Sequence, residues 1–191
     1  MTRTPRQASG PFYPDPLPLA QDNDLVRLSD NLKPAVGEVT DLYGTILSSI
    51  GEPLRNGTVE IWQADDTGAY IHEESDGHDQ RNQNFQGFGR FETDSTSRYH
   101  FRTVTPGKYP GRAKRIHMLA EYRGHRVLTT QLYIRGDKSN EGDFSLQEIP
   151  TAAERELVLV DYVPNPASPA GELLAHKDII VGLTPEDPET D

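Results

Sequence analysis

The chain has no cysteine, and it also lacks any long apolar run. Without cysteine there can be no disulfides, no thiolate zinc sites and no cysteine nucleophiles. No segment approaches the roughly 18 consecutive apolar residues that a membrane span needs. The first residues, Met1-Thr-Arg-Thr-Pro-Arg6, lead into polar, proline-rich sequence rather than into an apolar signal region. We therefore expect a cytoplasmic protein that does not enter a membrane.

The chain also has no excess of positive charge. The chain carries 19 Lys and Arg residues against 30 Asp and Glu residues, a formal net charge of −11. A nucleic-acid-binding protein is expected to have a basic face, so the composition argues against that class. It does not argue against a small anionic ligand, because a local basic cluster can oppose the overall sign. Arg112, Lys114 and Arg115 form such a cluster.

Proline and glycine, in contrast, are frequent, with 15 and 16 copies in 191 residues. They divide the chain at short intervals, which is typical of an all-β protein made of short strands and turns. No stretch of ten residues shows convincing helical periodicity. The sequence therefore predicts an all-β fold, a two-sheet antiparallel β-sandwich, in a single domain.

The chain divides into three regions. Residues 1–34 are predicted to form an extended arm, because they contain too many prolines for a helix or an inner strand. The arm is expected to pack on the domain surface or on a partner subunit, which is compatible with a homodimer. The sandwich is predicted over residues 35–184, and an acidic tail over 185–191. Residues 71–97 are expected to form a long loop over a functional site. The expected strands are 38–47, 57–64, 99–104, 115–122, 126–135, 154–163 and 173–182.

Two tyrosines lie on loops that follow predicted strands. Tyr70 comes after the apolar strand that ends at residue 64, and Tyr109 lies in the turn Pro106-Gly-Lys-Tyr-Pro-Gly111. The prolines and glycines of this turn are able to aim a tyrosine ring at a fixed point. Asp65 and Asp66, near Tyr70, are expected to shape their loop by accepting hydrogen bonds from backbone amides.

A histidine follows on the next predicted strand. Side chains alternate between the faces of a strand, so Arg115 and His117 point to one side and Ile116 to the other. A single tyrosine or histidine in such places is more often a packed structural residue. Together, however, two phenols and an imidazole form a donor set that suits ferric iron better than zinc or copper.

Eight segments between residues 10 and 137 carry a resemblance to a known family. They are Gly10-Pro-Phe-Tyr-Pro-Asp15, Gly44-Thr-Ile46, Val59-Glu-Ile-Trp-Gln-Ala-Asp65, Gly68-Ala-Tyr70, Phe88-Gly-Arg90, Tyr99-His-Phe-Arg-Thr103, Pro106-Gly-Lys-Tyr-Pro110 and Thr129-Thr-Gln-Leu-Tyr-Ile-Arg-Gly-Asp137. Each is weak alone, but the ordered set is specific. In this set the chain resembles the intradiol ring-cleavage dioxygenases, the family of catechol, hydroxyquinol and protocatechuate dioxygenases.

This resemblance implies a function and a set of site residues. Tyr70, Tyr109 and His117 match positions that bind Fe(III), Arg112 matches a residue lining the substrate pocket, and Gln131 matches one near the bound catechol. The family binds a catechol to Fe(III) through both oxygens, and O2 then opens the ring between the two hydroxyl-bearing carbons. The resemblance therefore implies an oxidoreductase that acts on a small aromatic diol with O2.

Arg115 departs from the family pattern, because it stands where the first histidine of a His-X-His pair is expected. A guanidinium has no free lone pair and stays protonated, so it cannot bind a metal as an imidazole does. Three functions remain open. The first is ring cleavage at an iron site with three protein ligands, where water or another side chain takes the fourth position. His72 and His100 are nearby in sequence. The second is a metal-free cyclase or lyase, in which Arg112 and Arg115 bind an anionic substrate and a tyrosine acts as acid or base. The third is a non-catalytic binding protein.

Overall fold

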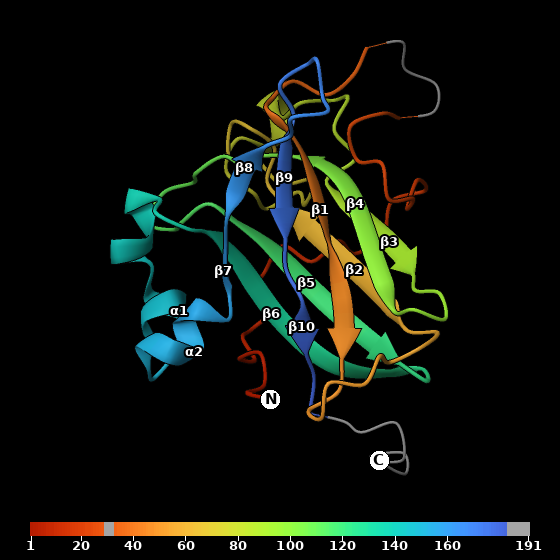
Figure 1. The fold of residues 1–191 in the computed structure, drawn as a ribbon. Coiled ribbons are helices and arrows are strands. Elements are labelled where there is room, and N and C mark those ends of the chain that lie inside the picture. Colours follow the sequence, from red (N-terminus) through yellow and green to blue (C-terminus); the bar gives the residue numbers. More distant parts are fainter. Residues whose placement is uncertain (29–32, 183–191) are drawn as a thin grey trace.

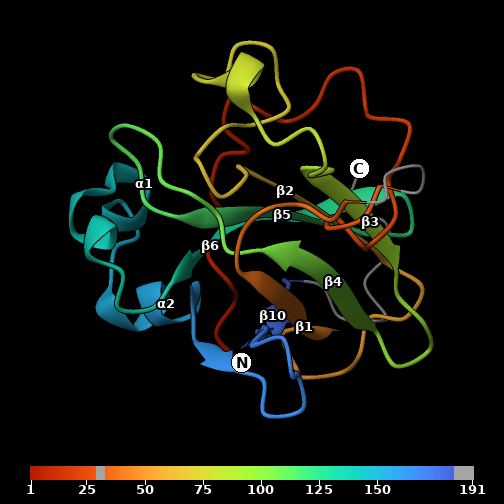
Figure 2. The same cartoon turned by 90° about the horizontal axis from the view of Figure 1, so that it is seen from above.

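The computed structural model describes residues 1–28 and 33–182, so the predicted acidic tail 185–191 lies outside the described residues. Within them, ten strands form two sheets that pack face to face (Figure 1 and Figure 2). The predicted two-sheet β-sandwich is therefore confirmed. The strands are β1 (Val39–Leu47), β2 (Thr58–Gln63), β3 (Phe88–Glu92), β4 (Arg98–Val104), β5 (Arg115–Tyr122), β6 (His125–Ile134), β7 (Leu159–Val160), β8 (Tyr162–Pro164), β9 (Leu173–His176) and β10 (Ile179–Ile180).

Not every strand pair is antiparallel. The first sheet has the order β10-β1-β9-β8 with β4 paired to β1, and the second has the order β3-β2-β5-β6-β7. The pairs β1–β9, β1–β10 and β6–β7 are parallel, and the other pairs are antiparallel. The parallel pairs all involve short strands from the last third of the chain, which the sequence did not distinguish from antiparallel ones.

The structure corrects three of the predicted elements. The strand predicted over 154–163 is wrong in its first part, because residues 154–156 belong to the helix α2 (Ala152–Glu156). Thr151 and Glu154 form a capping box there, each side chain accepting a hydrogen bond from the other residue's backbone N–H. The predicted loop 71–97 contains the strand β3, which pairs with β2. The strand predicted over 173–182 is divided into β9 and β10.

The hydrophobic core lies between the two sheets. Strand β5 shows the alternation clearly: Ile116, Met118 and Ala120 belong to this core, together with residues such as Leu42 and Phe101. The intervening β5 residues face the other side of the second sheet. A second cluster covers that outer face, and it includes aromatic residues from the long loops and the N-terminal arm.

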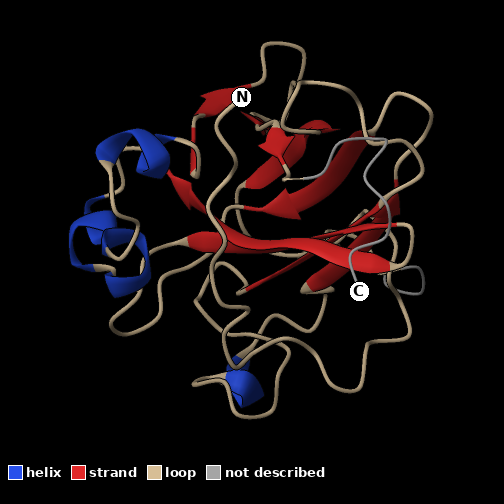
Figure 3. Cartoon of the chain, turned by 90° about the horizontal axis from the view of Figure 1, so that it is seen from below, coloured by secondary structure: helices blue, strands red, loops and turns tan. Residues whose placement is uncertain are grey.

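Helices and the arm complete the structure. The short elements η2 (Lys138–Gly142), α1 (Phe144–Gln147) and α2 gather at one side of the sandwich, and η1 (His78–Gln80) lies in the long loop (Figure 3). The arm contacts one strand of each sheet, because Thr4 N donates to Ile180 O and Gln7 N donates to Thr129 O, both over 2.9 Å.

Over residues 1–28 and 33–182, no helix combines the length and apolar character needed to span a bilayer.

Candidate active site

The outer face of the second sheet carries a patch of side chains from three neighbouring strands. His117 pairs with Gln131 and Arg115 with Tyr133 across β5 and β6, and β2 places Trp62 opposite His117. Residues two apart on a strand share a face, so all five side chains lie on one side of the sheet. None is more than 2% exposed. The sheet therefore places a cation and an imidazole side by side beneath the covering loops.

Two loops bring Tyr70 and Tyr109 onto this patch, and a glycine two residues before each tyrosine lets the loops approach. A Cβ atom on Gly68 would lie 2.5 Å from the carbonyl oxygen of Lys108. A Cβ atom on Gly107 would lie 2.4 Å from Gly68 N. These distances leave no room for a larger residue, so glycine at both places is what brings the two tyrosines together.

Asp65 fixes the loop that carries Tyr70. Its carboxylate accepts hydrogen bonds from the backbone N–H groups of residues 67, 68 and 69 over 2.9–3.0 Å and from Asn82 N over 2.7 Å. Its carbonyl oxygen accepts a hydrogen bond from Gly107 N over 2.7 Å. The predicted loop-shaping role of Asp65 is confirmed, and its backbone also connects the two loops.

Tyr70 and His117 are in direct contact within the patch. Tyr70 Oη lies 3.2 Å from His117 Nε2. The ring of Tyr109 stands edge-on to that of Tyr70, with 5.8 Å between the ring centroids. On its other side His117 stacks on Trp62, with centroids 5.0 Å apart and ring planes within 12°. The three residues predicted to bind a metal thus lie together.

Burial keeps this pair uncharged. It is the main cause that lowers the pKa of His117 well below its usual value, and the positive charges of Arg115 and Arg112 lower it further. Burial also raises the pKa of the Tyr70 hydroxyl, an effect that the charge of Arg115 partly opposes. The contact at neutral pH is therefore between a neutral phenol and a neutral imidazole.

Arg115 extends from the same strand to the other tyrosine. Its Nη2 donates to Tyr109 Oη over 2.5 Å, and its Nη1 donates to the carbonyl oxygen of Ala113 over 2.9 Å. The guanidinium carbon lies 4.9 Å from the centroid of the Tyr109 ring. Arg115 Nε is buried and has no hydrogen-bond partner among the described residues. A cation therefore contacts the phenol at the place where the resemblance puts a histidine.

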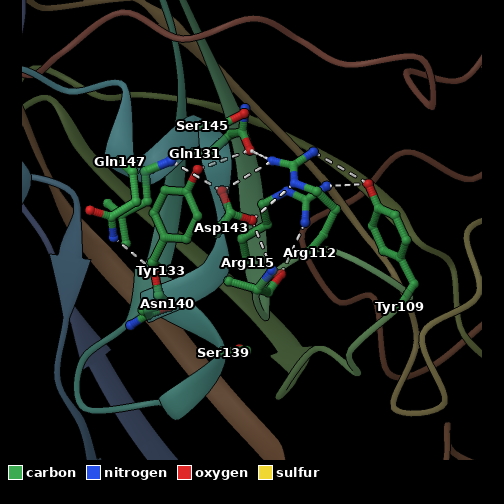
Figure 4. A network of polar contacts seen from close by, with 12 residues as sticks. Tyr109, Arg112, Arg115, Gln131, Tyr133, Ser139, Asn140, Asp143, Ser145 and Gln147 are labelled. Carbon is green, nitrogen blue, oxygen red and sulfur yellow. Dashed lines mark hydrogen bonds and ion pairs between the residues drawn. The ribbon is translucent and has the colours of Figure 1, made fainter.

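Arg112 connects Tyr109 to a wider polar network (Figure 4). Its Nε donates to Asp143 Oδ2 over 2.9 Å, its Nη2 to Gln131 Oε1 over 3.1 Å, and its Nη1 to Tyr109 Oη over 3.4 Å. Tyr133 Oη also donates to Gln131 Oε1, over 3.2 Å. Asp143 is fully buried, so it neutralises Arg112 inside the protein.

Sequence reasoning missed three members of this network. Tyr133 was detectable, because it lies two residues after Gln131 on a predicted strand and so shares its face. Asp143 was not, because it precedes a four-residue helix, where its side chain accepts a hydrogen bond from Leu146 N. Gln7 belongs to the distant arm, yet its Nε2 donates to Tyr133 Oη over 3.0 Å and its Oε1 accepts from Gln131 N over 3.1 Å.

The N-terminal arm covers the two tyrosines. The ring centroid of Phe12 lies 5.0 Å from that of Tyr70 and 5.9 Å from that of Tyr109. A Cβ atom on Gly10 would lie 3.4 Å from His117 Cε1, so the arm backbone passes directly over the imidazole. The arm is thus part of the site as well as a surface tail.

These donors do not fit a four-ligand ferric centre. Tyr109 Oη is hydrogen-bonded to Arg115, which cannot act as a ligand. A metal-bound histidine almost always donates its second ring N–H to an acceptor, but His117 Nδ1 is buried without a partner among the described residues. Among the described residues, no hydrogen bond joins His72 or His100 to Tyr70, Tyr109 or His117: His72 packs on Phe12 and its Nδ1 accepts a hydrogen bond from Glu74 N, and His100 pairs with Asp41 on the first sheet.

Comparison with known proteins identifies the family. A family model described as Dioxygenase matches residues 8–169. The chain is 37% identical over 147 residues to the protocatechuate 3,4-dioxygenase beta chain of Burkholderia cepacia, covering 72% of this chain and 62% of that protein. It is 32% identical over 178 residues to catechol 1,2-dioxygenase of Acinetobacter baylyi, covering 84% of this chain and 53% of that protein. The chain therefore spans less than two thirds of the length of these curated relatives.

Comparison with solved structures indicates the same family. The dioxygenase domain of a dioxygenase–carbohydrate-binding protein fusion from Streptomyces sp. SirexAA-E superposes with a TM-score of 0.70 at 26% identity, covering 96% of this chain and 100% of that one. Catechol 1,2-dioxygenase from Acinetobacter sp. ADP1 superposes with a TM-score of 0.71 at 27% identity, covering 94% and 62%. The match of the family model over most of the chain, the sequence identities and the shared sandwich lead to one conclusion: this chain belongs to the intradiol ring-cleavage dioxygenase family.

Proposed function

We propose that this chain is a metal-independent enzyme, a lyase or cyclase that moves protons on a small aromatic diol or a related phenol. The observation that carries the proposal is the 2.5 Å hydrogen bond from Arg115 Nη2 to Tyr109 Oη. This hydrogen bond places the permanently charged guanidinium of Arg115 against the hydroxyl oxygen of Tyr109. By the family resemblance, that oxygen would bind iron. The chemistry then has to come from the protein's own groups.

The charge at the site supports this proposal. Asp143 neutralises Arg112, which leaves the positive charge of Arg115. Fe(III) held by two tyrosinates would add another net positive charge beside it. At about 4 Å and an effective dielectric constant of about 20, two like unit charges repel by about 4 kcal/mol before screening. An anionic substrate is instead attracted by the same guanidinium.

Tyr109 is the general acid in this proposal. Its oxygen accepts hydrogen bonds from Arg115 and Arg112, so both guanidinium groups stabilise the tyrosinate that forms when Tyr109 gives its proton to the substrate. Between this protonation and the loss of another substrate proton, a lyase breaks a bond of the substrate and a cyclase closes a ring within it. The proton that the substrate loses returns to Tyr109 at the end of the cycle, and no oxidant or reductant is consumed. Gln131, held by Arg112 and by the carbonyl oxygen of Ala8, positions the substrate.

Iron-dependent ring cleavage is a second candidate, favoured by the 3.2 Å contact between Tyr70 Oη and His117 Nε2 beside the Tyr109 ring. In that case Tyr70, Tyr109 and His117 would hold Fe(III), and the metal would activate a catechol toward O2. Arg115 would first have to leave Tyr109.

Four measurements on the purified protein test the proposal. Elemental analysis and visible absorption report iron bound to tyrosinate, and an oxygen electrode reports cleavage of catechol. Proton NMR in D2O reports exchange of the ring C–H protons of resorcinol, an electron-rich dihydroxybenzene. We expect little iron, no oxygen uptake, and catalysed exchange that survives a chelator. Tyr109→Phe should abolish the exchange, and Tyr43→Phe, on the other sheet, should not.

The other outcomes distinguish the alternatives. Stoichiometric iron with oxygen uptake on catechol would establish the second candidate. If neither oxygen uptake nor exchange occurs, while aromatic ligands still bind, the chain is a binding protein.

A further inference from the structure

The N-terminal arm takes the place of a neighbouring strand along part of β6. Strand β7 pairs with the end of β6, and the arm follows the earlier part of the same edge. Arg6 Nη2 donates to Val127 O over 2.6 Å, and Gln7 N donates to Thr129 O over 2.9 Å. The side chain of Gln7 then continues the ladder, because its Oε1 accepts from Gln131 N over 3.1 Å. The arm is therefore fixed to the strand that carries Gln131.

The partners of the Gln7 side chain determine how its amide lies. Gln131 N can only donate a hydrogen bond, so the oxygen of the Gln7 amide has to face it. The carbonyl oxygen of Ser145 can only accept, so the amide nitrogen Nε2 faces Ser145, over 3.0 Å. The second hydrogen of Nε2 is directed to Tyr133 Oη, also over 3.0 Å. Both N–H groups and the oxygen of Gln7 are thus engaged, which leaves its amide one orientation.

Tyr133 passes this orientation on to Gln131. Burial raises the pKa of the Tyr133 hydroxyl to about 12, so the hydroxyl keeps its proton at neutral pH. Because Gln7 donates to the oxygen of Tyr133, the proton of Tyr133 points to another acceptor, Gln131 Oε1, at 3.2 Å. Gln131 Oε1 also accepts from Arg112 Nη2 over 3.1 Å. Two donors therefore hold the oxygen of the Gln131 amide.

The nitrogen of the same amide keeps one N–H group free. Gln131 Nε2 donates to the carbonyl oxygen of Ala8 over 3.0 Å, and an amide nitrogen has two hydrogens. The second hydrogen has no partner within residues 1–28 and 33–182. Gln131 is 2% exposed and lies beside His117 on the outer face of the second sheet. A buried donor without an acceptor is costly, so this N–H group suits an acceptor that enters the site.

We propose that Gln7 is a positioning residue that acts on Gln131 through the hydroxyl of Tyr133. It keeps the oxygen of the Gln131 amide on the guanidinium of Arg112 and leaves the free N–H group for an acceptor atom of the substrate. The inference rests on the proposed function for the reaction that this amide serves. The hydrogen-bond relay itself is a property of the protein and is measurable without any reaction.

The side-chain amide signals of Gln131 in 1H–15N NMR spectra test the relay, and their loss in Gln131→Glu assigns them. In Gln7→Ala the hydroxyl of Tyr133 loses the donor that directs its proton. We therefore expect the Gln131 signals to shift and their exchange with solvent to become about tenfold faster, the effect of one lost hydrogen bond. Tyr133→Phe should cause a similar change. Arg6→Ala is the matched control, because Arg6 holds the same arm to β6 without contacting Tyr133 or Gln131. Unchanged Gln131 signals in Gln7→Ala would overturn the inference.

Kinetics of resorcinol proton exchange separate a positioning role from a purely structural one. Gln7→Ala should lower kcat on the order of tenfold, and Arg6→Ala should not lower it. If Gln7 acts through Tyr133, adding Gln7→Ala to Tyr133→Phe should cause little further loss, because the relay is already broken. Additive losses would contradict the inference, since they would mean that Gln7 acts independently of Tyr133.

A failure of the proposed function is distinguishable from a failure of this inference. If the wild-type protein catalyses no exchange, the proposed function fails, and the Gln131 signals alone decide whether the relay exists. If Gln7→Ala does not fold, Gln7→Glu takes its place in both measurements. A glutamate keeps an acceptor for Gln131 N but has no donor for Tyr133, so the same changes are expected from it.

Discussion

The guanidinium of Arg115 holds Tyr109 in two ways, because Nη2 lies 2.5 Å from the hydroxyl oxygen and Cζ lies 4.9 Å from the ring centroid. The two residues are six positions apart, one in a Pro/Gly turn and one at the start of β5. The turn aims the ring and the strand aims the cation, so the contact follows from both local structures. The main chemical predictions for this protein follow from this one contact.

Replacing the cation by an imidazole should create an iron site. In Arg115→His, the positive charge is lost and a fourth donor faces Tyr70, Tyr109 and His117. We expect the variant to acquire close to one iron per chain and the visible absorption of tyrosinate bound to Fe(III), and the parent to bind little iron. Elemental analysis and absorption spectra after reconstitution with iron measure the difference.

Arg115→Gln is the matched control, because it removes the charge and supplies no imidazole. If the glutamine variant gains as much iron as the histidine variant, charge alone explains the parent's weak binding. If neither variant binds iron, the two tyrosines and His117 are not positioned to hold a metal, and the second candidate function fails as well.

The close approach of the two tyrosine loops predicts the effect of one added methyl group. In Gly107→Ala, the new Cβ would lie 2.4 Å from Gly68 N, so the turn that carries Tyr109 must move. Overpacking of this kind costs about 1–3 kcal/mol of stability. Thermal unfolding should show the loss, and the proton exchange of resorcinol should slow because Tyr109 is displaced. Gly142→Ala is the control, since nothing lies within 4 Å of the Cβ position there. Equal stabilities for the two variants would contradict the described loop contact.

The buried pair of Arg112 and Asp143 predicts a pH dependence. Burial alone would raise the pKa of Asp143, but hydrogen bonds from Arg112 and from the backbone N–H groups of Ala113 and Leu146 outweigh it, so the pKa is lowered. A lowered folded-state pKa contributes stability above the unfolded value of about 3.9, and this contribution is lost as the pH falls through the folded pKa. Asp143→Asn keeps an acceptor oxygen but removes the charge, so Arg112 is left unpaired.

The variant should therefore be less stable at pH 7 by about 3–5 kcal/mol, the usual cost of breaking a buried ion pair. Its stability should also fall less steeply than that of the wild type below about pH 4. Denaturant unfolding at several pH values measures both effects. Asp79→Asn, on an exposed part of the long loop, should match the wild type throughout. A variant with unchanged stability at pH 7 would mean that Asp143 is not the partner that neutralises Arg112.

The sequence was most informative where local pattern determines structure. Alternation along residues 115–122 correctly placed Arg115 and His117 on one face of the strand and Ile116 on the other, and the Pro/Gly turn indicated the tyrosine loop. Residues far apart in sequence were harder to connect. Nothing local in Gln7 or Asp143 shows that both lie in the network around Gln131, because a β-sandwich forms most of its contacts between distant segments. The prediction of short helices failed for another reason. Helix α2 has fewer than two turns, so its capping box was a better signal than its periodicity.

The position of Phe12 predicts that the arm controls access to the site. Its ring packs against both tyrosines, so a ligand has to displace it to reach Arg115 and Tyr109. Phe12→Ala should increase the association rate of resorcinol several-fold in stopped-flow measurements. It should lower stability by only about 1–2 kcal/mol, less than the loss at a fully buried phenylalanine, because Phe12 is partly exposed. Leu19→Ala is the control on the same arm, since Leu19 is fully exposed. If Phe12→Ala leaves the association rate unchanged, ligands reach Arg115 by a path that the arm does not cover.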